Sequence, residues 1–414
     1  MSLIKPFRGL RPADGRADAV AAPPYDVVDR AEAKALAADR PWSFLHISRP
    51  EIDLPDAVDP YDERVYRKGR ENLDRMVDEG VLVRDPEPRY YAYRLTMGGH
   101  VQTGLVATAS VEAYDNDRIK KHEFTRPVKE DDRVRQVDTL NAQTGPVFLV
   151  YKADATVDRI LREVSSNAPD IDVTASRDGV RHELWVIDGA ADIKALTDAF
   201  EAMPAIYVAD GHHRSAAGSR VGNARRQANP AHTGDESYNH FLSVIFPHDQ
   251  MQILDYNRVV ADLNDHDKDD FLAAIGNVFD LEVSSDPVKP SRSGEFGMYL
   301  DGQWYRLQIH DECIPADDPV ARLDVSLLQN NLIEPLLGVS DPRRDTRIDF
   351  VGGIRGLAGL EKRVDSGDWA VAFSLFPTTM EALMDVADAG EVMPPKSTWF
   401  EPKLADGLVS HVLD

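Results

Sequence analysis

The residues best suited to chemistry stand in the string Asp210-Gly211-His212-His213-Arg214, directly after the apolar run Ile206-Tyr207-Val208-Ala209. The apolar run predicts a buried strand, and the small residues Ser215-Ala216-Ala217-Gly218 predict a helix that approaches a sheet closely. Gly211 permits a tight turn with positive φ between the two elements. The string therefore predicts a strand-to-helix turn.

A turn of this kind is suited to binding anions. The first N–H groups of a helix lack an intrahelical acceptor, and the helix dipole favours negative charge beside them. His212, His213 and Arg214 add donors that suit phosphate oxygens. Asp210 is suited to holding a divalent metal or to orienting a histidine. The alternative is a charged turn with a solvated arginine and one packed histidine.

A second group of ionisable residues begins at Lys120-Lys121-His122-Glu123-Phe124-Thr125. Glu123 is suited to act as a general base, and Lys129 or Arg133 to clamp a phosphate. His122 and Thr125 are further candidates, but the string is not a zinc-protease H-E-x-x-H motif, because position 126 is arginine. The alternative is a solvated helix held by pairs of opposite charge.

Two proline-rich strings offer additional candidates. Ala22-Pro23-Pro24-Tyr25-Asp26-Val27 is rigid and could present Tyr25 and Asp26 to a cleft, although a structural turn is the more common explanation of such a string. Met393-Pro394-Pro395-Lys396-Ser397-Thr398 could contact an anion through Lys396 and Ser397, or form a rigid rim. The chain contains no phosphate-binding P-loop, no strand-linked G-x-G-x-x-G and no G-x-S-x-G elbow.

Composition limits the classes of function. The 414 residues include 47 Lys and Arg against 71 Asp and Glu, which gives a formal net charge of −24. Such a surface repels phosphate backbones, so we expect no nucleic-acid partner. The single cysteine, Cys313, fits a reducing compartment, and no apolar run of signal-peptide or membrane-spanning length occurs. We therefore expect a cytoplasmic protein with no membrane partner.

Hydrophobic periodicity predicts helices and strands in alternation without regular βαβ units. Prolines in the first forty residues predict irregular structure there. Helices are expected at 61–79, 157–165, 191–202, 214–227, 269–279 and 323–337, and strands at 90–97, 101–111, 145–151, 182–187, 205–209, 241–246 and 369–376, with a hairpin at 298–309. This pattern predicts an α+β fold with mixed or antiparallel sheets and packed helices, divided into domains at 1–150 and 151–414.

The sequence resembles the bacterial and archaeal family known as domain of unknown function 1015 along nearly its whole length. The resemblance rests on five strings in order, namely Pro6-Phe7-Arg8-Gly9-Leu10-Arg11-Pro12, Ala22-Pro23-Pro24-Tyr25-Asp26-Val27, His122-Glu123-Phe124-Thr125 with Asp132-Arg133, Ala209-Asp210-Gly211-His212-His213-Arg214, and Met393-Pro394-Pro395-Lys396-Ser397-Thr398. The family name implies no activity.

The string Asp210-Gly211-His212-His213-Arg214 is also similar to the signature of free serine kinases in the ParB/sulfiredoxin-like superfamily. That resemblance implies a ParB/sulfiredoxin-like unit and phosphate contacts from the five residues of the string. Those kinases use an upstream carboxylate as base, for which Glu123 is our first candidate and Asp26 our second. Sulfiredoxin chemistry is excluded because position 212 is histidine where that branch has cysteine.

Together these observations predict a phosphotransferase that moves a phosphoryl group from ATP, ADP or pyrophosphate to a small hydroxylated metabolite. Serine is the first candidate for this acceptor. Mg²⁺ is the expected cofactor, with Asp210 as its ligand. The alternatives are a nucleotide-binding regulator without turnover, and a phosphatase or nucleotide hydrolase. In each case the two groups of ionisable residues, around His122 and around His212, should line one site.

Overall fold

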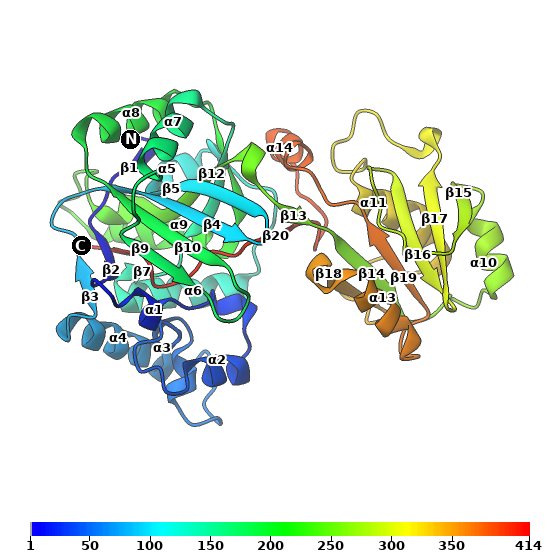
Figure 1. Cartoon of the computed structure of the whole chain (residues 1–414), viewed down its shortest axis with the longest axis horizontal. Helices are drawn as coiled ribbons and strands as arrows, with labels where there is room; N and C mark the ends of the chain where they lie inside the picture. The colour runs from blue at the N-terminus through cyan, green and yellow to red at the C-terminus, as the bar shows by residue number, and fades with distance from the viewer. Residues whose placement is uncertain (1) are drawn as a thin grey trace. The chain divides into compact units, whose positions relative to one another are not determined.

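The computed structural model describes residues 2–414 and divides them into two compact units. The first comprises residues 2–251 together with Pro402–Asp414, and the second comprises Gln252–Glu401 (Figure 1). This division replaces the expected one into 1–150 and 151–414. Strand β8 (Val147–Tyr151) pairs with two strands that come later in the chain, so residue 150 lies inside a sheet. The turn at Asp210 accordingly belongs to the first unit.

Within the described residues, the first unit contains a nine-stranded sheet in the order β6-β11-β8-β12-β5-β4-β10-β9, with β1 paired to β5. The other strands are β1 (Ile4–Lys5), β4 (Tyr90–Met97), β5 (His100–Ser110), β6 (Ile119–Lys120), β9 (Ile171–Thr174), β10 (Arg181–Ile187), β11 (Ile206–Asp210) and β12 (His240–Pro247). The pairs β6–β11 and β8–β12 are parallel, whereas the other pairs are antiparallel. The predicted α+β class with mixed sheets is confirmed.

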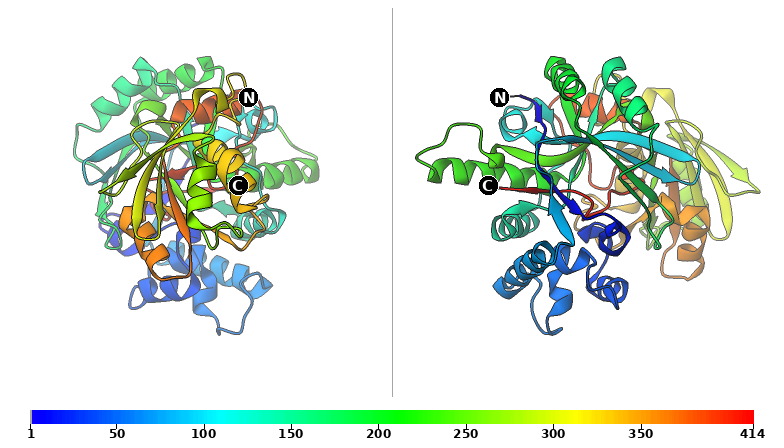
Figure 2. Two further views of the ribbon diagram at one scale, coloured as in Figure 1. Left: turned by 90° about the vertical axis from the view of Figure 1, so that its right-hand side faces the viewer. Right: turned by 60° about the vertical axis from the view of Figure 1, so that its left-hand side comes forward.

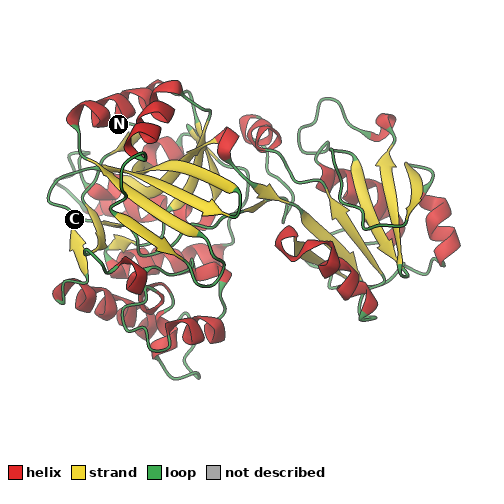
Figure 3. Ribbon diagram, in the orientation of Figure 1, coloured by secondary structure: helices red, strands yellow, loops and turns green. Residues whose placement is uncertain are grey.

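Helices α7 (Ala155–Val164) and α8 (Ala190–Ala202) pack against this sheet (Figure 3). Leu161 of α7 and Phe200 of α8 belong to the same buried cluster as Leu149 of β8 and Ile245 of β12. Each fully buried side chain of this size contributes about 1.5–3 kcal/mol relative to exposure. The apolar faces of the two helices therefore form a hydrophobic core with the side of the sheet that they cover.

Helix α9 (His212–Ala228) lies beside helix α6 (Pro127–Leu140) and against β12. A Cβ built at Gly218 would lie 3.0 Å from the Phe241 Cβ, and one at Gly222 would lie 2.5 Å from the Tyr238 carbonyl oxygen. Larger residues at these two positions would push the helix away. The predicted close approach of this helix to the sheet is thus confirmed.

The N-terminal region is more regular than its prolines suggest. Helix α2 (Arg30–Ala37) begins with a capping box, in which Asp29 and Glu32 each accept a hydrogen bond from the other's backbone N–H. Other elements of this region are α3 (Leu45–Ser48) and α4 (Glu63–Asp78). A four-stranded sheet ordered β3-β2-β21-β7 joins β2 (Gly9–Pro12) and β3 (Leu82–Arg84) to β7 (Ala142–Gln143) and the C-terminal β21 (Ser410–Val412). The end of the chain thereby returns to the first unit.

The second unit is built on an antiparallel sheet ordered β15-β17-β16-β19-β14-β18. Its strands are β14 (Tyr256–Val260), β15 (Phe279–Ser284), β16 (Glu295–Leu300), β17 (Gln303–Ile309), β18 (Ile348–Gly352) and β19 (Val371–Leu375), and its longer helices are α10 (Lys268–Ile275), α13 (Gly356–Asp365) and α14 (Met380–Asp388) (Figure 2). The predicted hairpin at 298–309 is present as β16 and β17. The predicted helix at 323–337 is interrupted by a π-helical turn at Gln329–Ile333. Across residues 2–414, no helix is long and apolar enough to cross a membrane.

Buried histidines make the stability of the first unit sensitive to acid. Burial lowers the pKa of His182 and of His411 to about 4, and that of His240 to about 3. An unfolded histidine titrates near pH 6.5, so between about pH 6.5 and 4 the unfolded chain takes up protons that the folded chain does not. The free energy of unfolding therefore falls as pH decreases through this window, by up to about 1.4 kcal/mol per pH unit for each histidine.

We expect His182→Gln to reduce the slope of unfolding free energy against pH between pH 6.5 and 5, because one buried neutral imidazole is removed. Urea unfolding at several pH values measures this slope. The matched control is Ser243→Ala, which alters a buried residue of the same unit that does not titrate and should leave the slope unchanged. Equal slopes for wild type and His182→Gln would contradict the interpretation.

Candidate functional site

The turn at the start of α9 has free backbone donors. Strand β11 ends at Asp210, and Gly211 forms the N-cap of α9 with φ of 91° and no side chain capping the helix. The Gly211 N–H donates to the Asp210 carboxylate at 2.8 Å, whereas the N–H groups of His212 and His213 have no acceptor within the described residues. A 17-residue helix thus presents two unpaired N–H groups at its positive end.

The parallel pairing of β6 with β11 brings the two groups of ionisable residues together. Both strands end at the same edge of the sheet, and His122 and His212 each lie two residues beyond the end of their strand. Their ring centroids are 4.5 Å apart at an interplanar angle of 89°. The Glu123 Oε2 lies 3.8 Å from the His212 Nδ1. The sequence placed these residues about ninety positions apart, and the structure makes them neighbours.

Burial keeps the two neighbouring imidazoles neutral. His122 is 2 % exposed and His212 is 5 % exposed. Burial lowers the pKa of His122 to about 4, with partial compensation from the Asp210 charge. The pKa of His212 lies well below its usual value because of burial and then the proximity of His122. At neutral pH both rings therefore offer lone pairs as well as N–H donors.

His213 is in a more open position beside them. Its Nε2 accepts a hydrogen bond of 3.0 Å from the backbone N–H of Arg126. Burial and the nearby Arg126 charge lower the pKa of His213, so the ring is neutral at pH 7. Because Nε2 is the acceptor, the proton of the neutral ring resides on Nδ1, which is thereby available as a donor.

Two arginines enclose the ring of Tyr25. The guanidinium carbon of Arg133 lies 3.9 Å from the ring centroid, and that of Arg214 lies 5.2 Å from it. Arg133 also pairs with Asp132 at 2.6 Å, and Arg214 pairs with Asp406 at 3.1 Å. Each arginine is thus held by one carboxylate and by the shared ring of Tyr25, an arrangement that fixes both guanidinium groups at low entropic cost.

The Arg214 side chain occupies space that only glycine leaves open. A Cβ built at Gly145 would lie 1.5 Å from the Arg214 Nη1 and 2.8 Å from the Asp406 Oδ1. The carboxylate of Asp406 is 2 % exposed, and burial raises its pKa, while the Arg214 charge partly offsets that rise. Gly145 and Asp406 therefore hold the Arg214 side chain in place, and sequence reasoning missed both. Neither stands in a motif, and only their contact with Arg214 identifies them.

Both carboxylate oxygens of Asp210 are bonded to groups of the protein. One carboxylate oxygen accepts from the Gly211 N–H, and the other lies 2.7 Å from the Lys403 Nζ. Burial alone would raise the pKa of Asp210, but the Lys403 charge and hydrogen bond lower it below the usual value. The predicted metal ligand is thus an ionised carboxylate with both oxygens bonded. The group of described residues whose ligand atoms lie within 4.8 Å of one another is instead His122, Glu123 and His212.

The remaining candidates are placed as follows. The Thr125 hydroxyl donates to Glu130 at 2.6 Å. The Lys129 Nζ lies 5.8 Å from the ring centroid of Tyr61, and the Lys129 charge is close enough to lower the pKa of His213. Asp26 is close enough for its charge to act on His213 and Arg214. Lys396 and Ser397 belong to the second unit, where the Lys396 carbonyl accepts from Arg258 and Ser397 donates to the Pro394 carbonyl.

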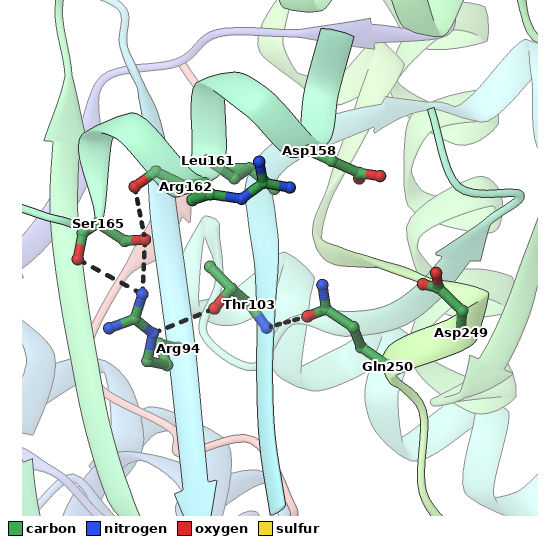
Figure 4. A pocket seen from close by; sticks show the side chains of 8 residues that line it. All are labelled: Arg94, Thr103, Asp158, Leu161, Arg162, Ser165, Asp249 and Gln250. Atoms are coloured by element: carbon green, nitrogen blue, oxygen red, sulfur yellow. Dashed lines mark hydrogen bonds between the residues drawn. The ribbon is translucent and has the colours of Figure 1, made fainter. Parts of the chain in front are cut away.

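A separate polar pocket of about 230 Å³ lies between α7 and strands β4 and β5 (Figure 4). It is lined by Arg94, Thr103, Asp158, Leu161, Arg162, Ser165, Asp249 and Gln250. Arg94 is already bonded to Ser165 and Thr103 and stacks on Trp185 at 4.9 Å. None of the residues of the α9 turn lines this pocket, so it is not part of the same site.

We expect Gly145→Ala to displace the Arg214 side chain and to disrupt its pairing with Asp406. Inserting a methyl group into a filled space typically lowers the free energy of unfolding by about 1–3 kcal/mol. The matched control is Gly99→Ala, at a position where a Cβ would meet no atom within 4 Å. Urea unfolding of both variants tests this. A Gly145→Ala protein as stable as the control would show that Arg214 has another equally good position.

Comparison with solved structures finds eight matching chains. One is a free serine kinase in complex with AMP, with 15 % identity and a TM-score of 0.34, covering 73 % of this chain and 92 % of that one. A conserved hypothetical protein from Pyrococcus furiosus has 14 % identity, a TM-score of 0.33 and coverages of 73 % and 95 %. SbnI from Staphylococcus aureus, truncated at its C-terminus, has 10 % identity, a TM-score of 0.36 and coverages of 73 % and 85 %. These values are too low to assign an activity to this chain.

No curated protein matches the sequence. A family model does match, and it covers residues 4–326, which include the turn at the start of α9, the edge-to-face pair of histidines and the arginines around Tyr25. Its description is "Protein of unknown function (DUF1015)". The chain therefore belongs to the DUF1015 family.

Proposed function

We propose that this protein binds a phosphate-bearing ligand at the start of α9 and transfers a phosphoryl group from a nucleotide or pyrophosphate to a small hydroxylated metabolite. The observation that carries the proposal is the pair of unpaired N–H groups of His212 and His213, beside the guanidinium of Arg214. Phosphate oxygens satisfy such donors directly, and the helix dipole adds to the attraction.

The surrounding charges support this proposal. The chain has a net charge of −24, so an anionic ligand needs a local positive site to approach. Arg133 and Arg214 supply guanidinium donors for such a ligand, although each is also paired with one carboxylate. The described residues engage only one guanidinium nitrogen of Arg214 in a hydrogen bond, the one to Asp406. The other donors of that guanidinium remain suited to bidentate contact with a phosphate.

Phosphoryl transfer depends mainly on positioning and on neutralising charge. In the proposed reaction Glu123 accepts the proton of the acceptor hydroxyl, His213 donates from Nδ1 to the transferring group, and Asp26 is the second candidate base. Mg²⁺ prefers oxygen ligands, and both oxygens of Asp210 are bonded to other donors. We therefore propose that Mg²⁺ binds together with the phosphates of ATP, ADP or pyrophosphate. Serine is the first acceptor to test, because the string at Asp210 resembles that of free serine kinases.

Arg214→Ala should weaken the binding of nucleotides by about 1.5–3 kcal/mol, the usual contribution of a charged hydrogen bond. To avoid leaving Asp406 unpaired in a buried position, the double variant Arg214→Ala/Asp406→Ala is measured as well. Arg225→Ala is the matched control, since it removes the same charge from the last turns of the same helix. Isothermal titration with ATP, ADP and pyrophosphate in the presence of Mg²⁺ gives the affinities. Equal losses for Arg214→Ala and Arg225→Ala would refute phosphate binding at the turn.

Glu123→Gln should reduce turnover by about 10²–10⁴-fold while nucleotide affinity changes little, because the amide keeps the size of the side chain but accepts no proton. Phosphorus NMR of the reaction with L-serine and related hydroxy compounds measures transfer. Glu163→Gln, on α7, is the control. Binding without any turnover in the wild type would favour the regulator, and phosphate release that needs no acceptor would favour the hydrolase. Full activity in Glu123→Gln would move the role of base to Asp26.

A further inference from the structure

The side chains of His122, Glu123 and His212 converge on one point at the end of β6 and β11. One ligand atom from each of the three residues lies within 4.8 Å of the other two. Ligand atoms bound at about 2.1 Å to a tetrahedral metal lie about 3.4 Å apart, so the group needs to contract by at most about 1.4 Å to hold an ion. Glu123 can provide this movement, because its side chain is 53 % exposed.

The two imidazoles carry buried nitrogens that the protein leaves unsatisfied. By strict hydrogen-bond geometry, neither ring nitrogen of His122 has a partner among the described residues, and the same holds for the His212 Nε2. The Val208 carbonyl lies close enough to one nitrogen of His122 to raise the pKa of that ring. Buried polar atoms are nearly always bonded, and each exception destabilises the fold. At least one nitrogen on each ring therefore lacks a partner, and a cation bound to those two nitrogens would satisfy both.

We infer that His122, Glu123 and His212 form a site for a zinc-like transition-metal dication, distinct from the Mg²⁺ that accompanies a nucleotide. Two neutral imidazoles and one carboxylate are ligands that suit Zn²⁺, Co²⁺ or Fe²⁺, whereas Mg²⁺ prefers oxygen ligands alone. The negative charge of Asp210 lies near both rings and adds a favourable field, while Lys121 opposes it.

Three protein ligands leave at least one coordination position open, as in metal sites that bind substrate. His212 is the first residue of α9, so this open position adjoins the unpaired N–H groups at the start of that helix. An oxygen of a bound phosphate or of the acceptor could fill it. In this role the metal site rests on the proposed function and adds to it. One oxygen of Glu123 suffices as a metal ligand, and the other remains able to accept a proton from the acceptor hydroxyl. Metal binding itself requires neither a nucleotide nor turnover.

The test is binding of Zn²⁺ and Co²⁺ to metal-free protein in the absence of nucleotide. We expect one Zn²⁺ per chain by titration calorimetry, and with Co²⁺ a visible absorption band that Zn²⁺ abolishes. His122→Gln and Glu123→Gln should each weaken Zn²⁺ binding by more than about 100-fold, since even the loss of an outer-shell partner typically costs 10–100-fold. Circular dichroism confirms that each variant is folded, and the exposed position of Glu123 makes at least that variant safe to interpret.

His213→Gln is the matched control, because it removes a neighbouring imidazole that lies outside the group and should leave Zn²⁺ affinity within about twofold. The site is supported if the wild type and His213→Gln bind Zn²⁺ stoichiometrically while His122→Gln and Glu123→Gln do not. Absence of Zn²⁺ and Co²⁺ binding in the wild type, or equal affinity in wild type and Glu123→Gln, overturns it. If metal binds but no nucleotide does, the proposed phosphoryl transfer fails while the metal site stands. If nucleotide binds and Zn²⁺ and Co²⁺ do not, the metal site fails while the proposed phosphoryl transfer stands.

Discussion

The parallel pairing of two short strands, β6 and β11, is the constraint on which the site depends. Parallel neighbours end at the same edge of a sheet, so the segments that follow them must emerge side by side. The segment after β6 carries His122 and Glu123, and the segment after β11 carries Gly211 and the start of α9. If β6 were antiparallel to β11, the two histidines would leave the sheet at opposite edges and no common site would exist.

The C-terminal segment completes what this pairing begins. Charges removed from solvent are costly unless they are paired, and the turn holds a half-buried aspartate and a largely buried arginine. Lys403 pairs with Asp210, and Asp406 pairs with Arg214, across about 190 positions of sequence. Strand β21 anchors this returning segment between β2 and β7. The chain thus leaves the first unit to form the second and returns to neutralise the site.

The two kinds of histidine at the site are suited to different tasks. His122 and His212 are buried and neutral, with nitrogens that lack hydrogen-bond partners, and this is the state in which imidazole binds a metal. His213 is more open, and its hydrogen bond from Arg126 leaves Nδ1 as a donor. His212 and His213 are therefore suited to different chemistry although they are adjacent in sequence, because the first turn of a helix directs successive side chains to different sides.

Local patterns of residues predicted the α+β class, most of the strands and helices, and the turn at Asp210, because alternating apolar residues, glycine at the turn and the small residues of α9 are local signals. They also predicted a candidate site at the residues around His122. Three features were visible only in the folded chain: Asp210 is bonded to Lys403, Gly145 makes room for Arg214, and Lys396 and Ser397 belong to the other unit. These features depend on positions far apart in the chain. The free energy of such contacts depends on strand pairing and burial, which a local pattern of residues does not predict.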